Sequence, residues 1–430
     1  MADKIKNLVA EWLEKESFPQ MIERDIDVTD VDQQSSILAI VGPRRSGKTW
    51  FMYQLIQKLL DKGVTKKDIL FVDFEDYRLI GIQPDHIDAI LSAFYQLTNQ
   101  HPTYLFFDEI HNLPQWSRVL RTLHNQNRYK IVVSGSNSSL LSQEIATELR
   151  GRYEDLLMLP FSYFELLRFN KINFDQKMLY TPKKGALLRV FDDYLKSGGF
   201  PDVIGKDSQV EKNSLLQSYF QTLFYKDLVE RYDIRSKNIL ETMMHYCLDV
   251  MGDLFSISQF KNVVTASDTP VSKKTISHYL HHFQEVFFLI VNEKFDYSPR
   301  KRIMNPKKIY LLDSGFSALS AQFSENRGKY LENAVAIHLY RNRKTMYYHR
   351  KDNECDFVVK QGVAMHSAIQ VCWELNEKNR KRELAGLAEA MRLFNIKNGM
   401  ILTYNQEGFQ EIDGIKIPVI PAYQWLLENK

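Results

Sequence analysis

The sequence predicts an α/β fold around a doubly wound parallel sheet, and three observations predict it. Short apolar runs alternate with amphipathic segments through about residue 165, as parallel strands alternate with helices. The first run, Ile37 to Val41, leads through a glycine-rich loop into an amphipathic stretch that Gly63 ends. The apolar runs are short and rich in branched residues, as buried parallel strands are. Three later runs repeat the pattern, beginning at Asp68, Tyr104 and Tyr129.

Composition limits the classes of protein that the chain can be. With 430 residues, of which 44% are hydrophobic and 25% charged, it is long enough for two to four globular domains. Its three cysteines, Cys247, Cys355 and Cys372, lie far apart, which argues against a disulfide framework or a zinc ribbon. No signal-type or membrane-spanning apolar run is visible. We therefore expect a cytoplasmic protein with no membrane partner, and the net charge of +3 means that any affinity for nucleic acid must come from local patches.

The loop after the first predicted strand reads GPRRSGKT, Gly42 to Thr49, and fits the pattern G-x-x-x-x-G-K-[ST] in full. Its backbone N–H groups and the following helix amino terminus can hold phosphate. Lys48 would bridge two phosphates of ATP, and the Thr49 hydroxyl would bind Mg²⁺. The alternative is a glycine-rich turn that matches by chance. The predicted nucleotide contacts are Gly42, Pro43, Arg44, Arg45, Ser46, Gly47, Lys48, Thr49 and Trp50.

A pair of acids ends the strand predicted at Tyr104. Asp108 would hold the Mg²⁺ shell, and Glu109 would reach a water in line with the terminal phosphate. The strand predicted at Tyr129 ends in Ser134, Ser136 and Asn137, which are able to sense that phosphate but are also ordinary turn residues. Arg150 and Arg152 follow. Either arginine could stabilise the negative charge of the transition state, in this subunit or in a neighbouring one, or could be an ordinary charged residue of the surface.

After the first α/β region the pattern becomes helical, and residues 185–250 show no strand signal. Residues 254–318 then give two short helices, a strand, a basic turn and a second strand, an order that predicts a winged helix-turn-helix. One face of its second helix is apolar, and the other face, with the basic turn, provides candidate contacts to double-stranded DNA. These contacts are Lys273, Lys274, Ser277, His278, Arg300, Lys301 and Arg302.

Between Val271 and Tyr310 eight lysines and arginines stand against three acids, an excess that favours DNA binding. Winged helices also dock onto proteins, so a protein partner is the alternative. From about Tyr330 the chain returns to α/β patterns, with a helix, a hairpin, a helix and a strand.

Taken together, these motifs resemble the AAA+-like ATPases of bacteria and archaea, which are related to the signal-transduction ATPases with numerous domains. The segments that carry the resemblance are GPRRSGKT, FVDFED, FFDEIHNLPQW, VVSGSNSSLL, LRGRYEDLLMLPFSYFELL and SGGFPDV. The resemblance implies a P-loop ATPase domain, a winged helix and a restriction-endonuclease-like domain, with ATP and Mg²⁺ as cofactors. It assigns Glu109 as base, Asn137 as sensor, and Arg152 as the likelier catalytic arginine. The expected parts are a helical segment (1–30), the ATPase core (31–170), a helical lid (171–250), the winged helix (251–320) and the nuclease-like domain (325–430).

A nuclease of that class carries a helix acid, a hairpin aspartate and then Glu-x-Lys. Here Glu332 and Asp356 fit the first two positions, but Gln370 replaces the glutamate and Cys372 the lysine. Gln370 keeps an oxygen for a metal without its charge, and a thiol neither favours Mg²⁺ nor stabilises a pentacovalent phosphate. Lys360 or the basic residues of NEKNRKRE could substitute, although nothing in the sequence places one there. The pattern thus favours a degenerate site in a fold kept for binding or assembly.

The combined expectation is a Mg²⁺-dependent ATPase whose nucleotide state changes how the winged helix and nuclease-like domain engage DNA or a protein partner. A different class remains open, in which the chain is a nucleotide-gated homo-oligomeric scaffold for signalling. An ATP-dependent DNA nuclease is the third and less favoured alternative.

Overall fold

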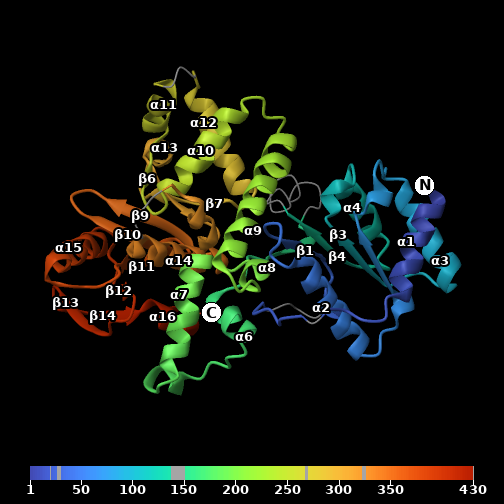
Figure 1. The fold of residues 1–430 in the computed structure, drawn as a ribbon, viewed down its shortest axis with the longest axis horizontal. Coiled ribbons are helices and arrows are strands. Elements are labelled where there is room, and N and C mark those ends of the chain that lie inside the picture. Colours follow the sequence, from blue (N-terminus) through green and yellow to red (C-terminus); the bar gives the residue numbers. More distant parts are fainter. Residues whose placement is uncertain (20, 27–30, 137–150, 267–269, 322–325, 430) are drawn as a thin grey trace. The chain divides into compact units, whose positions relative to one another are not determined.

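The chain forms two compact units, Met1–Pro160 and Phe161–Lys430, in a computed structural model (Figure 1). The structure describes residues 1–19, 21–26, 31–136, 151–266, 270–321 and 326–429. No helix in these ranges is long and apolar enough to cross a membrane.

The first unit is built on a five-stranded sheet in which every pair is parallel, in the order β2-β3-β4-β1-β5. The apolar runs become strands because their branched and aromatic residues are almost entirely buried there. The parallel sheet with a glycine-rich loop after its first strand is the arrangement that the sequence predicted. The strands are β1 (Ile37–Val41), β2 (Ile69–Asp73), β3 (Tyr104–Asp108), β4 (Lys130–Gly135) and β5 (Tyr153–Leu157).

Strand order determines where the polar strand ends meet. Because β4 lies between β1 and β3, its carboxyl end falls between the glycine-rich loop and the two acids. Right-handed crossovers place the helix after β1 on one face of the sheet and the next two helices on the other, and Figure 1 shows α2 and α4 on opposite sides. These helices are α2 (Lys48–Asp61), α3 (His86–Thr98) and α4 (Trp116–Asn125).

The amino-terminal helix α1 (Ala2–Glu14) packs against α3 and β2 of the same unit. Its apolar stripe is buried, and the Trp12 Nε1 donates a hydrogen bond of 2.6 Å to the Ile69 carbonyl of β2. The helix is shorter than the segment predicted for residues 1–30, because an extended stretch begins at Lys15.

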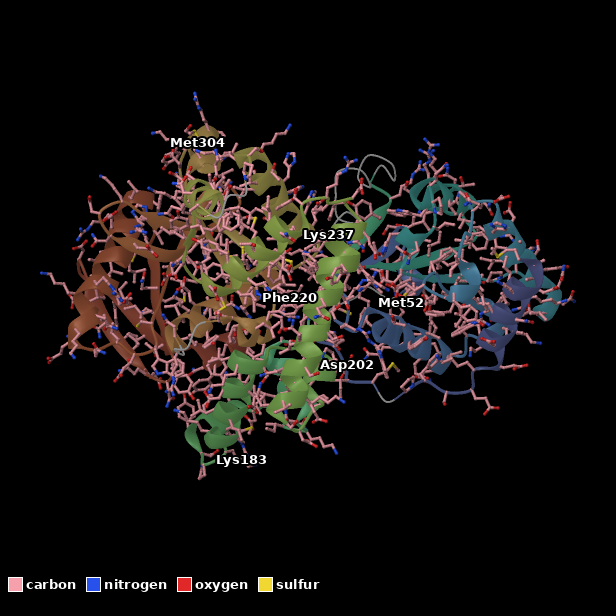
Figure 2. The ribbon with its side chains drawn as sticks, turned by 45° about the horizontal axis from the view of Figure 1, so that its top comes forward. Met52, Lys183, Asp202, Phe220, Lys237 and Met304 are labelled. Carbon is pink, nitrogen blue, oxygen red and sulfur yellow. The ribbon has the colours of Figure 1, made fainter. Side chains whose placement is uncertain are left out.

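From Phe200 onward, the first helices of the second unit share one apolar core with the elements after them. The helix α9 continues as a π-helical stretch, Leu223–Glu230, and Phe220 on α9 is buried in this core (Figure 2). The helices before residue 250 are α6 (Tyr163–Phe169), α7 (Lys184–Ser197), α8 (Pro201–Ile204), α9 (Gln209–Thr222) and α10 (Lys237–Asp249).

The next segment has two helices, a strand, a basic connection and a second strand, in the order that the sequence predicted, and a two-residue strand precedes them. The basic turn is a short helix between the last two strands, and Met304 at its end is 74% exposed (Figure 2). The elements are β6 (Leu254–Phe255), α11 (Ile257–Thr265), α12 (Lys273–Glu285), β7 (Leu289–Lys294), α13 (Pro299–Met304) and β8 (Lys307–Leu311).

One mixed nine-stranded sheet runs through the second unit, in the order β13-β14-β12-β11-β10-β9-β7-β8-β6. The strands β7 and β9 pair in parallel, so the β6, β7 and β8 strands are continuous with the carboxy-terminal strands. The remaining elements are α14 (Arg327–Arg341), β9 (Thr345–Arg350), β10 (Glu354–Gln361), β11 (Ala364–Val371), α15 (Glu377–Phe394), β12 (Asn398–Thr403), β13 (Gly408–Ile412), β14 (Ile415–Pro421) and α16 (Ala422–Glu428).

Candidate functional site

The glycine-rich loop packs tightly under β1. A Cβ at Gly42 would lie 1.9 Å from the Met158 carbonyl oxygen, so no other residue fits there without moving the backbone. Lys48 opens α2 and is buried, and its Nζ donates to the carbonyls of Gly42 (3.2 Å) and Pro43 (3.0 Å). The lysine is therefore folded back over its own loop.

Thr49 and Asp108 meet at the ends of α2 and β3. The Thr49 hydroxyl donates to Asp108 Oδ2 at 2.6 Å, and the Ser134 hydroxyl of β4 donates to Asp108 Oδ1. Burial raises the pKa of Asp108 to about 6, and the charge of Glu109 adds to this rise, while the two hydroxyl hydrogen bonds oppose it. The threonine and aspartate together offer the hard oxygen ligands that Mg²⁺ prefers.

Glu109 follows β3 in the left-handed region, with φ of +47°. Its Oε1 lies 3.3 Å from the Lys48 Nζ, and its Oε2 accepts a 3.1 Å hydrogen bond from the Ser136 N–H and lies 3.3 Å from the His111 Nδ1. Burial alone would raise its pKa, but the charges of Lys48, His111 and Arg44 outweigh burial and lower the pKa to about 2. Glu109 is thus ionised and oriented.

The arrangement of these groups suits a phosphate and a metal. The hydroxyls of Ser46 and Ser136 are buried and have no hydrogen-bond partner among the described residues. Buried polar atoms usually find a partner, so these two hydroxyls are consistent with a polar ligand held beside Lys48 and Asp108. The residues present therefore fit ATP and Mg²⁺, with Lys48 on phosphate oxygens and Thr49 and Asp108 on the metal side.

The other predicted nucleotide contacts lie around this centre. Arg44 forms an ion pair with Glu75, Arg45 is exposed with φ of +65°, and Trp50 is 44% exposed on α2. Asn137, predicted as a sensor, and Arg150 lie outside the described residues.

Arg152 does not reach the site of its own chain. It directly precedes β5, where its carbonyl accepts from the Ile37 N–H at the amino end of β1, and its guanidinium donates to Asn125 Oδ1 at 2.7 Å. The glycine-rich loop follows the carboxyl end of the five-residue β1, about 16 Å away at 3.3 Å per residue. This placement is inconsistent with the expectation that Arg152 acts in the site of its own chain. That Arg152 acts in the site of a neighbouring subunit stays a prediction.

Sequence reasoning missed Arg24. This buried side chain donates from NH1 to the Ser46 carbonyl at 2.7 Å and from NH2 to the Leu159 carbonyl at 2.6 Å. Arg24 lies in a segment without regular structure, and its two hydrogen bonds link the glycine-rich loop to Leu159 near the end of the first unit. No periodic pattern surrounds Arg24, so the sequence held no signal for this role. His111 was missed as well, although its position two residues after Glu109 was a usable signal.

The candidate DNA-contacting face of α12 is arranged as predicted. Ile276, Tyr279, Leu280 and Phe283 are buried, whereas Lys273, Lys274, Ser277 and His278 are exposed. Arg300 and Lys301 are exposed on α13, and Arg302 is half-buried. The basic excess counted from sequence is nevertheless smaller at the surface, because Lys307 and Lys308 are both buried in ion pairs with acids.

The second unit also brings together the acids predicted for a nuclease-like site. Glu332 lies on α14, Asp356 on β10 and Gln370 on β11, and all three line one pocket of about 790 Å³. Cys372 lies there too, and burial raises the pKa of its thiol to about 12, so it stays neutral. Lys360 does not line this pocket, whereas Arg382 from the NEKNRKRE segment does.

A lysine that was not predicted occupies the centre of this cluster. Lys308 of β8 places its Nζ 2.7 Å from Asp356 Oδ1, 2.7 Å from Glu332 Oε1 and 2.9 Å from Glu354 Oε1. Burial would lower its pKa, but the charges of Asp356 and Glu332 outweigh burial, so the pKa lies well above the ordinary value. A lysine at the start of an otherwise apolar strand was the only sequence signal.

The sheet and the site define the class of protein: residues 34–167 match the family described as an AAA domain, within the P-loop nucleoside triphosphatases. Residues 188–327 match a family described as a domain of unknown function, DUF8612. The chain is 33% identical to the uncharacterized protein MJ1544 of Methanocaldococcus jannaschii over 99% of its own length and 96% of that protein, and it belongs to the same family.

Other similarities are weaker. An uncharacterized protein of Haemophilus influenzae is 26% identical, covering 91% of this chain and 94% of that protein. The Walker-type ATPase PABY2304 of Pyrococcus abyssi aligns with a TM-score of 0.43 and 12% identity, over 67% of this chain and 92% of that one. The Aeropyrum pernix Orc1 protein, solved in complex with DNA, aligns with a TM-score of 0.29 and 13% identity, over 72% of this chain and 87% of that one.

Proposed function

We propose that the protein binds and hydrolyses ATP with Mg²⁺ and uses its nucleotide state to change how the second unit engages double-stranded DNA. The observation that carries the ATPase part is the meeting of Lys48, Thr49, Asp108 and Glu109 at the carboxyl ends of β1 and β3. Phosphoryl transfer to water requires a cation that binds phosphate, oxygen ligands on the metal side and an ionised carboxylate, and these four residues provide all of them.

Each residue of this set has a role in the proposal. Lys48 binds phosphate oxygens and lowers the cost of charge on them, and Glu109 orients the attacking water and accepts its proton. Bound Mg²⁺ supplies further neutralisation of the phosphate charge. Ser136 and His111 hold the Glu109 carboxylate in place through its Oε2. The low pKa of Glu109 keeps the base ionised at neutral pH.

The DNA part of the proposal is supported by the first turn of α12. Lys273 and Lys274 begin this helix, where the helix dipole disfavours cations by roughly 0.3–1 kcal/mol. Helix stability therefore does not explain them. The two lysines are exposed at the amino end of the helix, and Ser277 and His278 are exposed one turn further on. This arrangement fits a helix whose amino end contacts DNA phosphates and whose exposed face contacts the edges of the bases.

The β7–β8 connection extends the same basic surface. Arg300 and Lys301 are exposed on α13, which Ser298 caps by accepting from the Lys301 N–H. We propose that β6, α11, α12, β7 and β8 form a winged helix with α13 as the wing tip. The carboxy-terminal strands continue its sheet, so a shift in one would be transmitted to the other.

The test is the ATPase rate of the full chain with and without double-stranded DNA, at low and high salt. We expect stimulation by DNA that is lost at high salt, since phosphate contacts depend on counterion release. Replacing Lys273, Lys274, Arg300 and Lys301 with alanine should remove the stimulation, and the matched Lys4→Ala/Lys6→Ala variant on exposed positions of α1 should keep it.

An ATPase rate that DNA does not change, accompanied by an ATP-dependent change in particle mass, would instead favour the oligomeric signalling scaffold. No phosphate release by the wild-type protein under any of these conditions would refute the ATPase proposal itself.

A further inference from the structure

Arg44 lies in the glycine-rich loop and reaches a residue that follows β2, the edge strand of the first sheet. Its guanidinium forms an ion pair with Glu75, in which NH1 donates to Oε1. Arg44 follows β1, whereas Glu75 comes two residues after the end of β2. The strand order β2-β3-β4-β1 sets these two strands three steps apart, which is about 14 Å. The arginine side chain therefore lies across the carboxyl ends of β4 and β3.

The end of β3 carries the acids of the proposed ATPase site. Asp108 ends this strand and Glu109 follows it. Burial would raise the pKa of Glu109, but the charges of three neighbours outweigh burial and lower the pKa to about 2. These neighbours are Lys48, His111 and Arg44. The Arg44 guanidinium thus lies close enough to act on the proposed base, at the edge where the terminal phosphate of ATP would bind.

The ion pair between Arg44 and Glu75 is one that a phosphate can replace. Their side chains are 22% and 42% exposed, and an ion pair that water reaches contributes little to stability. Glu75 is held in place by its backbone, because its N–H donates to Asp73 Oδ1 at 2.8 Å. A guanidinium can bind phosphate through two parallel hydrogen bonds, and a terminal phosphate carries more negative charge than one carboxylate. Exchange of Glu75 for a bound phosphate is therefore favourable.

Two other arginines of the first unit are engaged elsewhere. Arg24 donates to two backbone carbonyls, and Arg152 lies at the amino end of β1 and donates to Asn125. Phosphoryl transfer is accelerated by an arginine that stabilises the charge on the transferred phosphate in the transition state. Arg44, unlike these two, crosses the edge where that phosphate would be bound.

We propose that Glu75 holds Arg44 in the nucleotide-free protein, and that Arg44 moves to the terminal phosphate of ATP and stabilises the transition state of hydrolysis. This role rests on the proposed ATPase function. In the step, the water oxygen bonds to the terminal phosphorus and Glu109 takes a proton from the water. The bond from that phosphorus to the bridging oxygen breaks, and its electron pair stays on ADP. One water is consumed, and ADP and inorganic phosphate result.

The test measures ATP and ADP affinity of the full chain with Mg²⁺ and fluorescent nucleotide analogues, and phosphate release in a single turnover. Arg44→Ala should slow phosphate release by about 10³-fold or more, as loss of such an arginine does. ADP lacks the terminal phosphate and should bind within a few-fold. Arg44→Lys should recover only part of the rate, because an ammonium lacks the guanidinium's paired donors. The matched control is Arg118→Ala, an exposed arginine on α4, which should behave as the wild type.

Glu75→Gln tests the exchange separately from the chemistry. A neutral side chain no longer holds Arg44, so ATP should bind several-fold more tightly while ADP affinity stays the same. A residue that only supported the fold would change both affinities together. Glu14→Gln, at an exposed position of α1, is the matched control and should change neither. Added guanidinium ion should restore part of the phosphate release of Arg44→Ala, but not that of Lys48→Ala.

Phosphate release at the wild-type rate in Arg44→Ala would overturn the proposal, and so would an unchanged ratio of ATP to ADP affinity in Glu75→Gln. Thermal melting of each variant separates these results from unfolding, and the Glu75 variant decides the matter if Arg44→Ala does not fold. No phosphate release by the wild type would refute the ATPase function and this role together. Wild-type hydrolysis with unaffected variants would refute the role of Arg44 alone.

Discussion

Lys48 and Glu109 form a buried ion pair, with the Lys48 Nζ 3.3 Å from the Glu109 Oε1. The lysine belongs to the glycine-rich loop and the glutamate follows β3, two strands away in the sheet. The pair joins the proposed phosphate-binding group to the proposed base. Phosphate that binds Lys48 must therefore compete with the Glu109 carboxylate for the same ammonium.

We expect Lys48→Ala to lower ATP affinity by about 100-fold, since a hydrogen bond to a charged group contributes roughly 1.5–3 kcal/mol. Titration with a fluorescent ATP analogue measures this. Lys58→Ala, an exposed lysine on the same helix, is the control and should bind as the wild type does. Equal affinity in the Lys48 variant would show that the loop does not bind phosphate through this lysine.

Glu109→Gln should keep ATP affinity within a few-fold and reduce phosphate release by about 10²- to 10⁴-fold, the range for loss of a general base. Glutamine keeps the shape of the side chain and its contact with the Ser136 N–H but cannot take a proton. Single-turnover phosphate release separates this effect from binding. Turnover at the wild-type rate would remove Glu109 from the proposed mechanism.

The raised pKa of Asp108, about 6 in the protein without nucleotide, predicts a pH dependence. Below pH 6 the carboxyl is increasingly protonated, and a neutral carboxyl binds Mg²⁺ weakly. The Mg²⁺-dependent part of ATP affinity should therefore fall between pH 7.5 and pH 5.5, beyond the change that free Mg²⁺ and ATP show in buffer. Asp108→Asn should lack this extra dependence, and a parallel decline in both proteins would assign it to another group.

The same shift predicts a change in stability. The pKa of Asp108 in the folded protein lies above its ordinary value of 3.8, so ionising this carboxyl lowers the free energy of unfolding. The free energy of unfolding therefore falls as the pH rises from 3.8 through about 6. Asp108→Asn should thus raise the thermal midpoint more at pH 7.5 than at pH 4. A gain of equal size at both pH values would be inconsistent with a raised pKa.

Gly386→Ala should destabilise the second unit by about 1–3 kcal/mol, as overpacking does, because the added Cβ would meet the Glu354 carbonyl oxygen at 1.9 Å. Gly185→Ala, in the first turn of α7, is the matched control. Its Cβ would meet nothing within 4 Å, and alanine favours helix by up to about 1 kcal/mol. Denaturant melting compares the two, and equal midpoints would show that α15 can move away from β10.

Local features of the site were predictable from sequence because they depend on short-range patterns. The loop at Gly42 must lie between a buried strand and a helix, and the acids at Asp108 must end a parallel strand. Both placements follow from periodicity and from the rule that parallel strands end at one edge. The buried and exposed faces of α12 followed from its spacing of apolar residues in the same way.

Contacts between distant segments were not predictable. Arg24 reaches the Ser46 carbonyl from a segment without periodicity, and Lys308 reaches Asp356 across 48 residues. Arg152 was assigned to the site by its motif, but the register of β5 against β1 places it at the opposite end of the sheet. Long-range pairing and strand register decide such contacts, and neither leaves a local signal.

The sequence by itself determined the P-loop class, the catalytic pair Asp108 and Glu109 as candidates, and the basic face of α12. Each follows from residue spacing along one element. Only the tertiary structure decided that Lys308 lies among Glu332, Glu354 and Asp356, where the sequence had shown only a neutral cysteine at position 372. The physical reason is that a charge cluster depends on distance through space, and three separate elements of the second unit, β8, α14 and β10, bring the three carboxylates within 3 Å of one ammonium.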